Sequence, residues 1–73
     1  MAAEATIVLA VGQCWRPADP GAGIRRITRL GPDGGDRLRY VREDGSEAWW
    51  VSRIDFLVWI AVHDARLELR TRW

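Results

Sequence analysis

Few residues in this 73-residue chain are of the types that perform acid–base, nucleophilic or metal chemistry. His63 is the only histidine, and Asp64 follows it. They could be a base with its orienting acid, but neighbours on a strand point to opposite faces, so we expect His63 to be a surface or tail residue. Cys14 is the only cysteine, and a lone histidine and a lone cysteine lack the spacing of a metal site. We therefore predict no catalytic residues, no metal and no cofactor.

The glycine-rich stretches lack the signatures of phosphate-binding loops. Residues 31–35 do not end in the Gly-Lys-Ser/Thr of a P-loop, and Gly21-x-Gly23 lacks the third glycine of a dinucleotide fingerprint. The paired acids Glu43 and Asp44 precede Gly45, and Asp-Gly is typical of a turn. The sequence thus predicts a protein that is not an enzyme.

The pair Trp49-Trp50 is the most informative candidate for binding. Adjacent side chains on a strand point to opposite faces, so we expect one indole in the core and the other at the surface. An exposed tryptophan beside arginines is typical of a protein-binding hot spot. Trp49, Trp50 and Arg39 are therefore the predicted protein-binding residues. The alternative is that the segment carrying Trp59 or Trp73 covers the outer indole.

A second candidate site consists of arginines on two neighbouring predicted strands, namely Arg25, Arg29, Arg37 and Arg39. If these side chains share one face with an exposed tryptophan, they could bind a single-stranded nucleic acid through charge and stacking. Acidic residues in the adjoining turns would repel phosphate, namely Asp33, Asp36, Glu43, Asp44 and Glu47. Solvated ion pairs between the strands are the simpler interpretation. Nucleic-acid binding is the alternative function.

Size and charge narrow the class of protein further. Eleven basic and ten acidic residues give a net charge of +1, whereas proteins held by phosphate contacts show a clear basic excess. A chain this short buries only about 60–65% of its unfolded surface, and its single cysteine excludes an internal disulfide. Dense packing of its five tryptophans or self-association into a homodimer would compensate. A small enzyme with a pocket shared between copies is a third, open class.

The chain is predicted to be a single domain over residues 1–73. We expect a barrel over about residues 6–62, with less order in residues 1–5 and 64–73. The first residues lack the basic region of a signal peptide, and the apolar run 56–62 is far shorter than the roughly 20 residues of a membrane span. These features predict a soluble, cytoplasmic protein.

Short β-rich segments alternate with Gly- and Pro-containing turns. Residues 6–11 and 13–16 predict the first strand, with Gly12 as a bend or bulge, and residues 24–30 predict the second. Ile24 and Ile27 have opposite parity, so we expect a bulge near residues 25–26. Residues 37–43 and 48–51 flank Asp44-Gly45 in the pattern of a β-hairpin. Four or five such strands predict a closed or nearly closed small barrel.

The segment after residue 52 fits two structures. As a helix, it carries an apolar stripe with helical spacing at Ile54, Leu57, Val58, Ala61, Val62 and Ala65. As a strand, residues 56–62 form a continuous β-rich run. Because Ser52-x-x-Asp55 is a candidate capping box, we predict a short helical turn over residues 52–57. A strand and a loosely held tail to residue 73 would follow it.

These features together resemble SH3-like small β-barrels. Gly12 and Trp15 match the opening, and the later matching positions are Leu38, Tyr40, Val41, Gly45, Trp50, Val51, Phe56 and Leu57. More narrowly, this ending resembles that of short bacterial and prophage proteins. The resemblance implies an all-β, single SH3-like barrel of four to five antiparallel strands with one short helical turn.

The same resemblance implies a binding module without chemistry of its own, of a kind often encoded on mobile elements. We therefore predict a non-enzymatic protein-binding accessory encoded by a phage or other mobile element. It would mask a surface on a larger complex, as an anti-CRISPR inhibitor does. Its partner would be a protein, with nucleic acid as the alternative and no association with a membrane.

Overall fold

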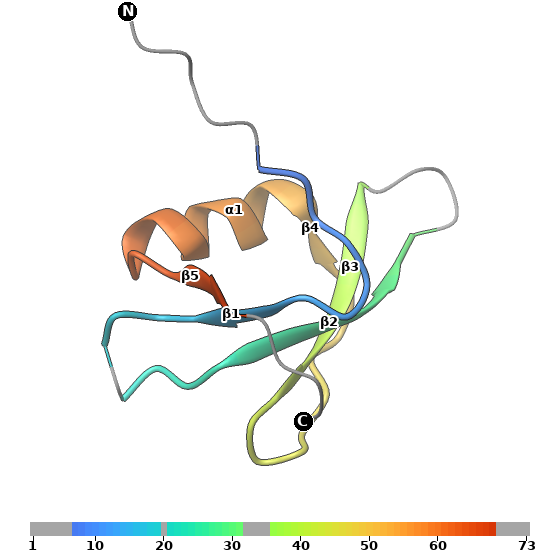
Figure 1. The fold of residues 1–73 in the computed structure, drawn as a ribbon. Helices are drawn as coiled ribbons and strands as arrows, with labels where there is room; N and C mark the ends of the chain where they lie inside the picture. The colour runs from blue at the N-terminus through green and yellow to red at the C-terminus, as the bar shows by residue number, and fades with distance from the viewer. Residues whose placement is uncertain (1–6, 20, 32–35, 69–73) are drawn as a thin grey trace, which may run out of the picture.

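The fold is one five-stranded antiparallel sheet with a single helix, seen in a computed structural model that describes residues 7–19, 21–31 and 36–68 (Figure 1). The strand order is β4-β3-β2-β1-β5. The elements are β1 (Cys14–Arg16), β2 (Arg25–Leu30), β3 (Arg37–Arg42), β4 (Val51–Ser52), α1 (Arg53–Val62) and β5 (Arg66–Glu68). This arrangement confirms the predicted all-β class with four to five antiparallel strands.

The last strand returns the chain to the edge of the sheet beside the first. Trp15 of β1 pairs with Leu67 of β5, so β5 belongs to the sheet although it lies beyond the predicted barrel boundary at residue 62. The predicted lead-in at residues 1–5, the tail from residue 69 and the turn at residues 32–35 lie outside the described residues.

The first strand is shorter than predicted. Residues 7–10 adopt no regular structure, and β1 begins only at Cys14. Gly12 forms the predicted bend: its φ is 96°, and its N–H donates to the carbonyl of Ile27 at 2.8 Å. Because a left-handed φ suits glycine and interrupts a strand, the β-branched residues before it do not extend β1. Leu9 is nevertheless buried in the core.

The β2–β3 pair contains a β-bulge at Thr28. Ile27 pairs with Tyr40 and the next pair joins Arg29 to Arg39, which leaves Thr28 as the extra residue. The bulge predicted near residues 25–26 was therefore misplaced. An extra residue reverses the alternation of side chains, so residues before and after Thr28 that are an even number apart lie on opposite faces.

Ile24 and Ile27, whose opposite parity led us to expect a bulge between them, are buried in two different places. Ile27 is completely buried in the core, whereas Ile24 is buried outside the core cluster. Ile24 lines a shallow hollow that also includes Arg16 and Pro17. The core and this hollow therefore accommodate the two isoleucines separately, with no bulge between them.

The predicted turn at Asp44-Gly45 is present. Gly45 has a φ of 90°, and its N–H donates to the carbonyl of Arg42 at 2.9 Å. The Asp44 carboxylate accepts a hydrogen bond from the Ser46 N–H at 2.8 Å. The turn chemistry that the sequence predicts is thus realised by backbone and side-chain bonds together.

The strand predicted after this turn, over residues 48–51, is mostly absent. The returning chain contacts β3 through a bridge between Val41 and Glu47 and through the Ala48 N–H, which donates to the Tyr40 carbonyl at 2.9 Å. Regular pairing resumes only at β4, where Val51 lies opposite Leu38. Residues 48–50 therefore form an irregular link.

Helix α1 starts at the predicted cap and runs further than predicted. The Ser52 hydroxyl accepts a hydrogen bond from the Asp55 N–H at 3.0 Å, which satisfies one of the unpaired donors at the helix start. The helix continues to Val62 and has His63 as its C-cap. The strand predicted after residue 57 was therefore wrong, and strand structure returns only at β5.

The helix buries a different face from the predicted stripe. Phe56, Trp59 and Ile60 are its buried residues. Of the predicted stripe, Ala65 is buried just beyond the helix and Leu57 is partly buried, whereas the remaining four residues are exposed: Ile54, Val58, Ala61 and Val62. Residues 56–62 are all apolar, so the larger aromatic rings decide the orientation because their burial removes the most apolar surface from water.

The core lies between the sheet and α1. Ile27, Leu38 and Phe56 are the largest completely buried side chains. The Phe56 ring packs at an angle on Tyr40, with 5.6 Å between ring centroids, and on Trp59, at 5.5 Å. Within the described ranges, no helix is long and apolar enough to cross a membrane.

Candidate functional site

The predicted protein-binding residues come together on one surface, which we call the Trp49 surface (Trp49, Arg39 and Trp50). The guanidinium carbon of Arg39 is 5.6 Å from the Trp49 ring centroid and 6.0 Å from that of Trp50. Both distances are at the outer limit of a cation–π contact. Two adjacent indoles thus share one arginine.

The two indoles differ in exposure, and neither belongs to the core. Trp49 is 77% exposed, and Trp50 is partly buried outside the core cluster. The prediction that one of the pair would be a core residue was therefore wrong. Ala48 occupies the inward position instead, since it is buried and bonded to the Tyr40 carbonyl. A two-residue alternation cannot continue through the irregular link before β4.

Hydrogen bonds hold Arg39 beside the indoles. Its Nε donates to the Ala48 carbonyl at 3.3 Å, and its Nη2 lies 3.4 Å from a carboxylate oxygen of Glu47. Both acceptors belong to the chain segment that carries the tryptophans. Binding to this surface would therefore require little further ordering of the Arg39 side chain.

Three of the four arginines considered for nucleic-acid binding share the outer face of the sheet, the side turned away from the core. Leu38 and Tyr40 are buried in the core, so Arg37 and Arg39 of the same strand point outward. Arg29 lies directly opposite Arg39 and shares its face.

The fourth arginine, Arg25, lies on the core side, so the prediction of one shared basic face was wrong for this residue. Its guanidinium carbon is 4.5 Å from the centroid of the Tyr40 ring and 4.1 Å from that of Trp59. The physical reason is the bulge at Thr28, which places Arg25 and Arg29 on opposite faces. Burial against these rings lowers the pKa of Arg25 from its ordinary value.

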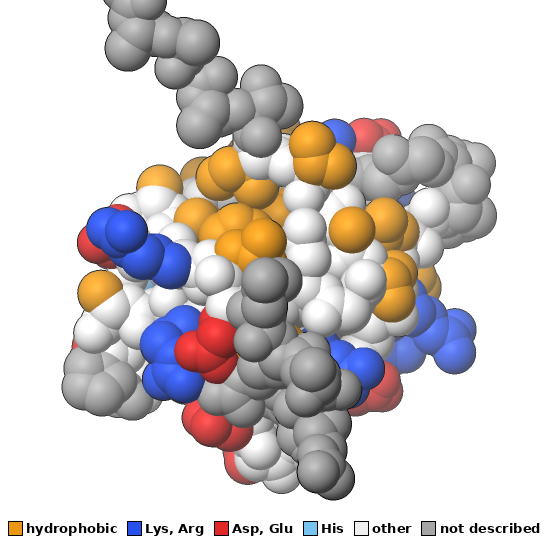
Figure 2. All heavy atoms as spheres, in the orientation of Figure 1, with side chains coloured by type: hydrophobic (Ala, Val, Ile, Leu, Met, Phe, Trp, Pro, Cys, Tyr) orange, Lys and Arg blue, Asp and Glu red, His pale blue; other side chains and the backbone are white. Residues whose placement is uncertain are grey.

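Charges of both signs lie side by side over much of the molecule. Figure 2 shows one face on which hydrophobic side chains gather over the upper half, while basic and acidic groups adjoin one another around the margin. Ion pairs join Arg16 to Glu68, Arg39 to Glu47 and Arg66 to Asp64. Of the pairings predicted between the strand arginines and the turn acids, the Arg39–Glu47 pair is present among the described residues. The Arg16–Glu68 contact, which joins β1 to β5, was not predicted.

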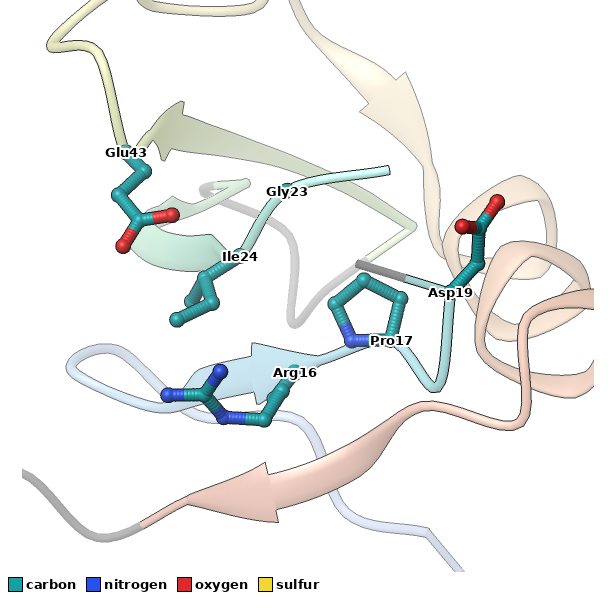
Figure 3. Close-up of a pocket in the computed structure, with 6 residues that line it drawn as sticks. All are labelled: Arg16, Pro17, Asp19, Gly23, Ile24 and Glu43. Carbon is teal, nitrogen blue, oxygen red and sulfur yellow. The ribbon is translucent and has the colours of Figure 1, made fainter. Parts of the chain in front are cut away.

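A shallow hollow of about 90 Å³, open to solvent, lies where β1 meets the loop before β2 (Figure 3). Its lining residues are Arg16, Pro17, Asp19, Gly23, Ile24 and Glu43. The hydrogen bond to Glu68 raises the pKa of Arg16, and Glu43 contributes in the same direction. No sequence pattern indicates this hollow, because its residues come from three separate segments. None of its described lining residues is a nucleophile with an adjacent base.

Cys14 and His63, the residues first considered for catalysis, both pack against other parts of the fold. Cys14 is buried in β1. The His63 ring packs against Trp59 with 5.5 Å between centroids, and the His63 carbonyl accepts a hydrogen bond from the Ala18 N–H at 2.9 Å. In residues 7–19, 21–31 and 36–68, no three side chains of His, Cys, Asp or Glu are grouped to hold a metal ion.

Comparison with protein families, with curated proteins and with solved structures finds no significant match to this chain.

Proposed function

We propose that this protein is a non-enzymatic binding module that docks a partner protein on the Trp49 surface. The observation that supports this function is the 77% exposure of Trp49 beside the positioned guanidinium of Arg39. Leaving an indole in water forgoes a large hydrophobic gain, and burial of that indole by a partner would recover it.

The composition of the Trp49 surface also supports protein binding. Tryptophan and arginine are the residue types most enriched among binding hot spots. Arg39 is already fixed by Glu47 and the Ala48 carbonyl, so docking would cost little side-chain entropy. We further propose that the partner belongs to a larger host or phage complex that this mobile-element protein masks, as an anti-CRISPR inhibitor does. Small size and a net charge of +1 suit such a masking role.

The test is affinity capture from host lysate, with nuclease added to half of each sample. We expect the native chain to retain a discrete protein partner after nuclease treatment. Trp49→Ala should remain folded and lose that partner, because it removes an exposed side chain without opening a cavity in the core. Ile54→Ala, which truncates another exposed apolar side chain on α1, is the matched control and should retain the partner.

Two outcomes would contradict this function. Retention of the same partner by folded Trp49→Ala at native yield would exclude the Trp49 surface. Recovery of nucleic acid alone, lost on nuclease treatment, would favour the second candidate function.

That second function is binding of single-stranded nucleic acid on the outer face. It is favoured by the direct opposition of Arg29 and Arg39, with Arg37 on the same face and Trp49 exposed nearby. The indole would stack on a base while the arginines contact phosphates. Its signature is a steep loss of affinity with salt, and Arg29→Gln should reduce the slope against salt by about 0.7 to 1.

A further inference from the structure

A second arginine pair lies on the other side of the sheet from the Trp49 surface. Arg25 of β2 and Arg42 of β3 are direct partners in the antiparallel register. Like charges directly opposite one another destabilise a sheet unless something offsets the repulsion. Among the residues that the structure describes, neither arginine takes part in an ion pair with a carboxylate.

The guanidinium of Arg25 lies against two aromatic rings. Its guanidinium carbon lies over both Tyr40 and Trp59, at 4.5 and 4.1 Å from the ring centroids. A guanidinium over an aromatic ring uses its flat face, whereas its N–H donors project along its edge. In the described part of the chain, no hydrogen bond from the Arg25 side chain occupies these donors. Burial and the neighbouring charge of Arg42 both lower the pKa of Arg25.

Arg42 approaches the same ring and is held there. Its guanidinium carbon is 5.3 Å from the Tyr40 centroid. Its Nη1 donates to the Ser46 hydroxyl at 3.3 Å, and its Nη2 is 3.5 Å from the Tyr40 hydroxyl. The two guanidinium groups thus border a single aromatic ring and come from strand positions that are direct partners.

We propose that Arg25 and Arg42 form a binding site for a carboxylate. The edge of a guanidinium presents two parallel N–H donors, and this spacing matches the two oxygens of a carboxylate. One negative charge between the two arginines would remove their mutual repulsion. The partly buried position of Arg25 would strengthen the pairing relative to a fully exposed pair. This site is independent of the Trp49 surface, because the two lie on opposite faces of the sheet.

The test is titration of the isotope-labelled full chain with sodium acetate, with sodium chloride lowered to keep the ionic strength constant. The side-chain Nε–Hε resonances of the arginines would be followed by NMR. We expect a saturable shift for Arg25 and none for Arg53, an exposed arginine at the start of α1. Arg42→Gln should weaken acetate binding roughly tenfold, because it removes a charged hydrogen-bond donor. Arg53→Gln, the matched control, should bind acetate like the native chain.

Arg25→Lys provides a second variant that retains the charge but removes the planar donor edge. If it folds, it should also bind acetate more weakly than the native chain. Equal shifts of Arg25 and Arg53 would overturn the proposal, as would native affinity in Arg42→Gln. A saturable response to inorganic phosphate without one to acetate would overturn the assignment to a carboxylate.

Discussion

The guanidinium of Arg25 lies over the indole of Trp59, with 4.1 Å between the guanidinium carbon and the ring centroid. A charged side chain thereby covers an edge of the hydrophobic core, because Trp59 and Tyr40 beneath it are both buried. The contact combines cation–π attraction with packing of the aliphatic stem of the arginine. It also joins β2 to the helix.

We expect Arg25→Ala to lower the free energy of unfolding by about 1–2 kcal/mol, through loss of both ring contacts and of stem packing. Urea denaturation followed by tryptophan fluorescence measures this change. Arg53→Ala removes an exposed arginine and should change stability by less than about 0.5 kcal/mol. Equal effects of the two substitutions would show that Arg25 does not stabilise the core.

Truncation at the centre of the core should be far more damaging. We expect Phe56→Ala to cost about 3–5 kcal/mol, because it removes a completely buried ring that contacts Tyr40 and Trp59. This is a large part of the stability of a small domain. Val58→Ala, on the exposed face of the same helix, should cost less than about 1 kcal/mol. Denaturation monitored by circular dichroism compares the two. Similar losses would mean that α1 buries a different face.

Loss of the helix cap should have an intermediate effect. Ser52→Ala removes the acceptor of the Asp55 N–H and should destabilise the protein by about 1 kcal/mol. Ser52→Asp retains an acceptor oxygen and should remain within a few tenths of a kcal/mol of the native chain. Thermal unfolding of the three proteins measures the order. Equal loss in both variants would assign the effect to the hydroxyl itself and not to capping.

The turn aspartate should make stability depend on pH. The hydrogen bond from the Ser46 side chain, followed by that from the Ser46 backbone, lowers the pKa of Asp44 below its ordinary value of 3.8. A lowered native pKa means that the ionised group stabilises the fold. The contribution is complete above the unfolded pKa and is lost as the pH falls through the lower native pKa.

Asp44→Asn keeps an acceptor oxygen at this position but cannot ionise. We expect its stability to approach that of the native chain as the pH falls from about 6 to about 2. Urea midpoints across this range measure the difference. A constant difference at all pH values would show that ionisation of Asp44 does not contribute.

Local chemistry predicted much of the fold. The turn at Asp44-Gly45, the bend at Gly12 and the cap at Ser52 all follow from residue types whose backbone preferences are strong. These features depend on a few consecutive residues, which is why the sequence alone was sufficient.

The remaining features depend on contacts between distant segments. Residues 56–62 are apolar throughout, so their pattern could not decide between helix and strand or select the buried face. The outward position of Trp49 follows from the burial of Ala48 beneath an irregular link, and regular alternation does not predict it. The face on which Arg25 lies depends on the position of the bulge. The opposite parity of Ile24 and Ile27 indicated a bulge near residues 25–26, because the sequence does not show that the two isoleucines are buried in different places.

Thr28 has a consequence for how this protein can evolve. Because it is the extra residue in β2, the number of residues between Arg25 and Arg29 decides which arginine faces which environment. A substitution at Thr28 preserves that number. A one-residue deletion would put Arg25 and Arg29 on the same face, so that either Arg25 would leave the core side or Arg29 would leave the outer face. Deletions and insertions at this position should therefore be selected against much more strongly than substitutions. The length of β2 should therefore be conserved more strictly than the identity of its bulged residue, Thr28.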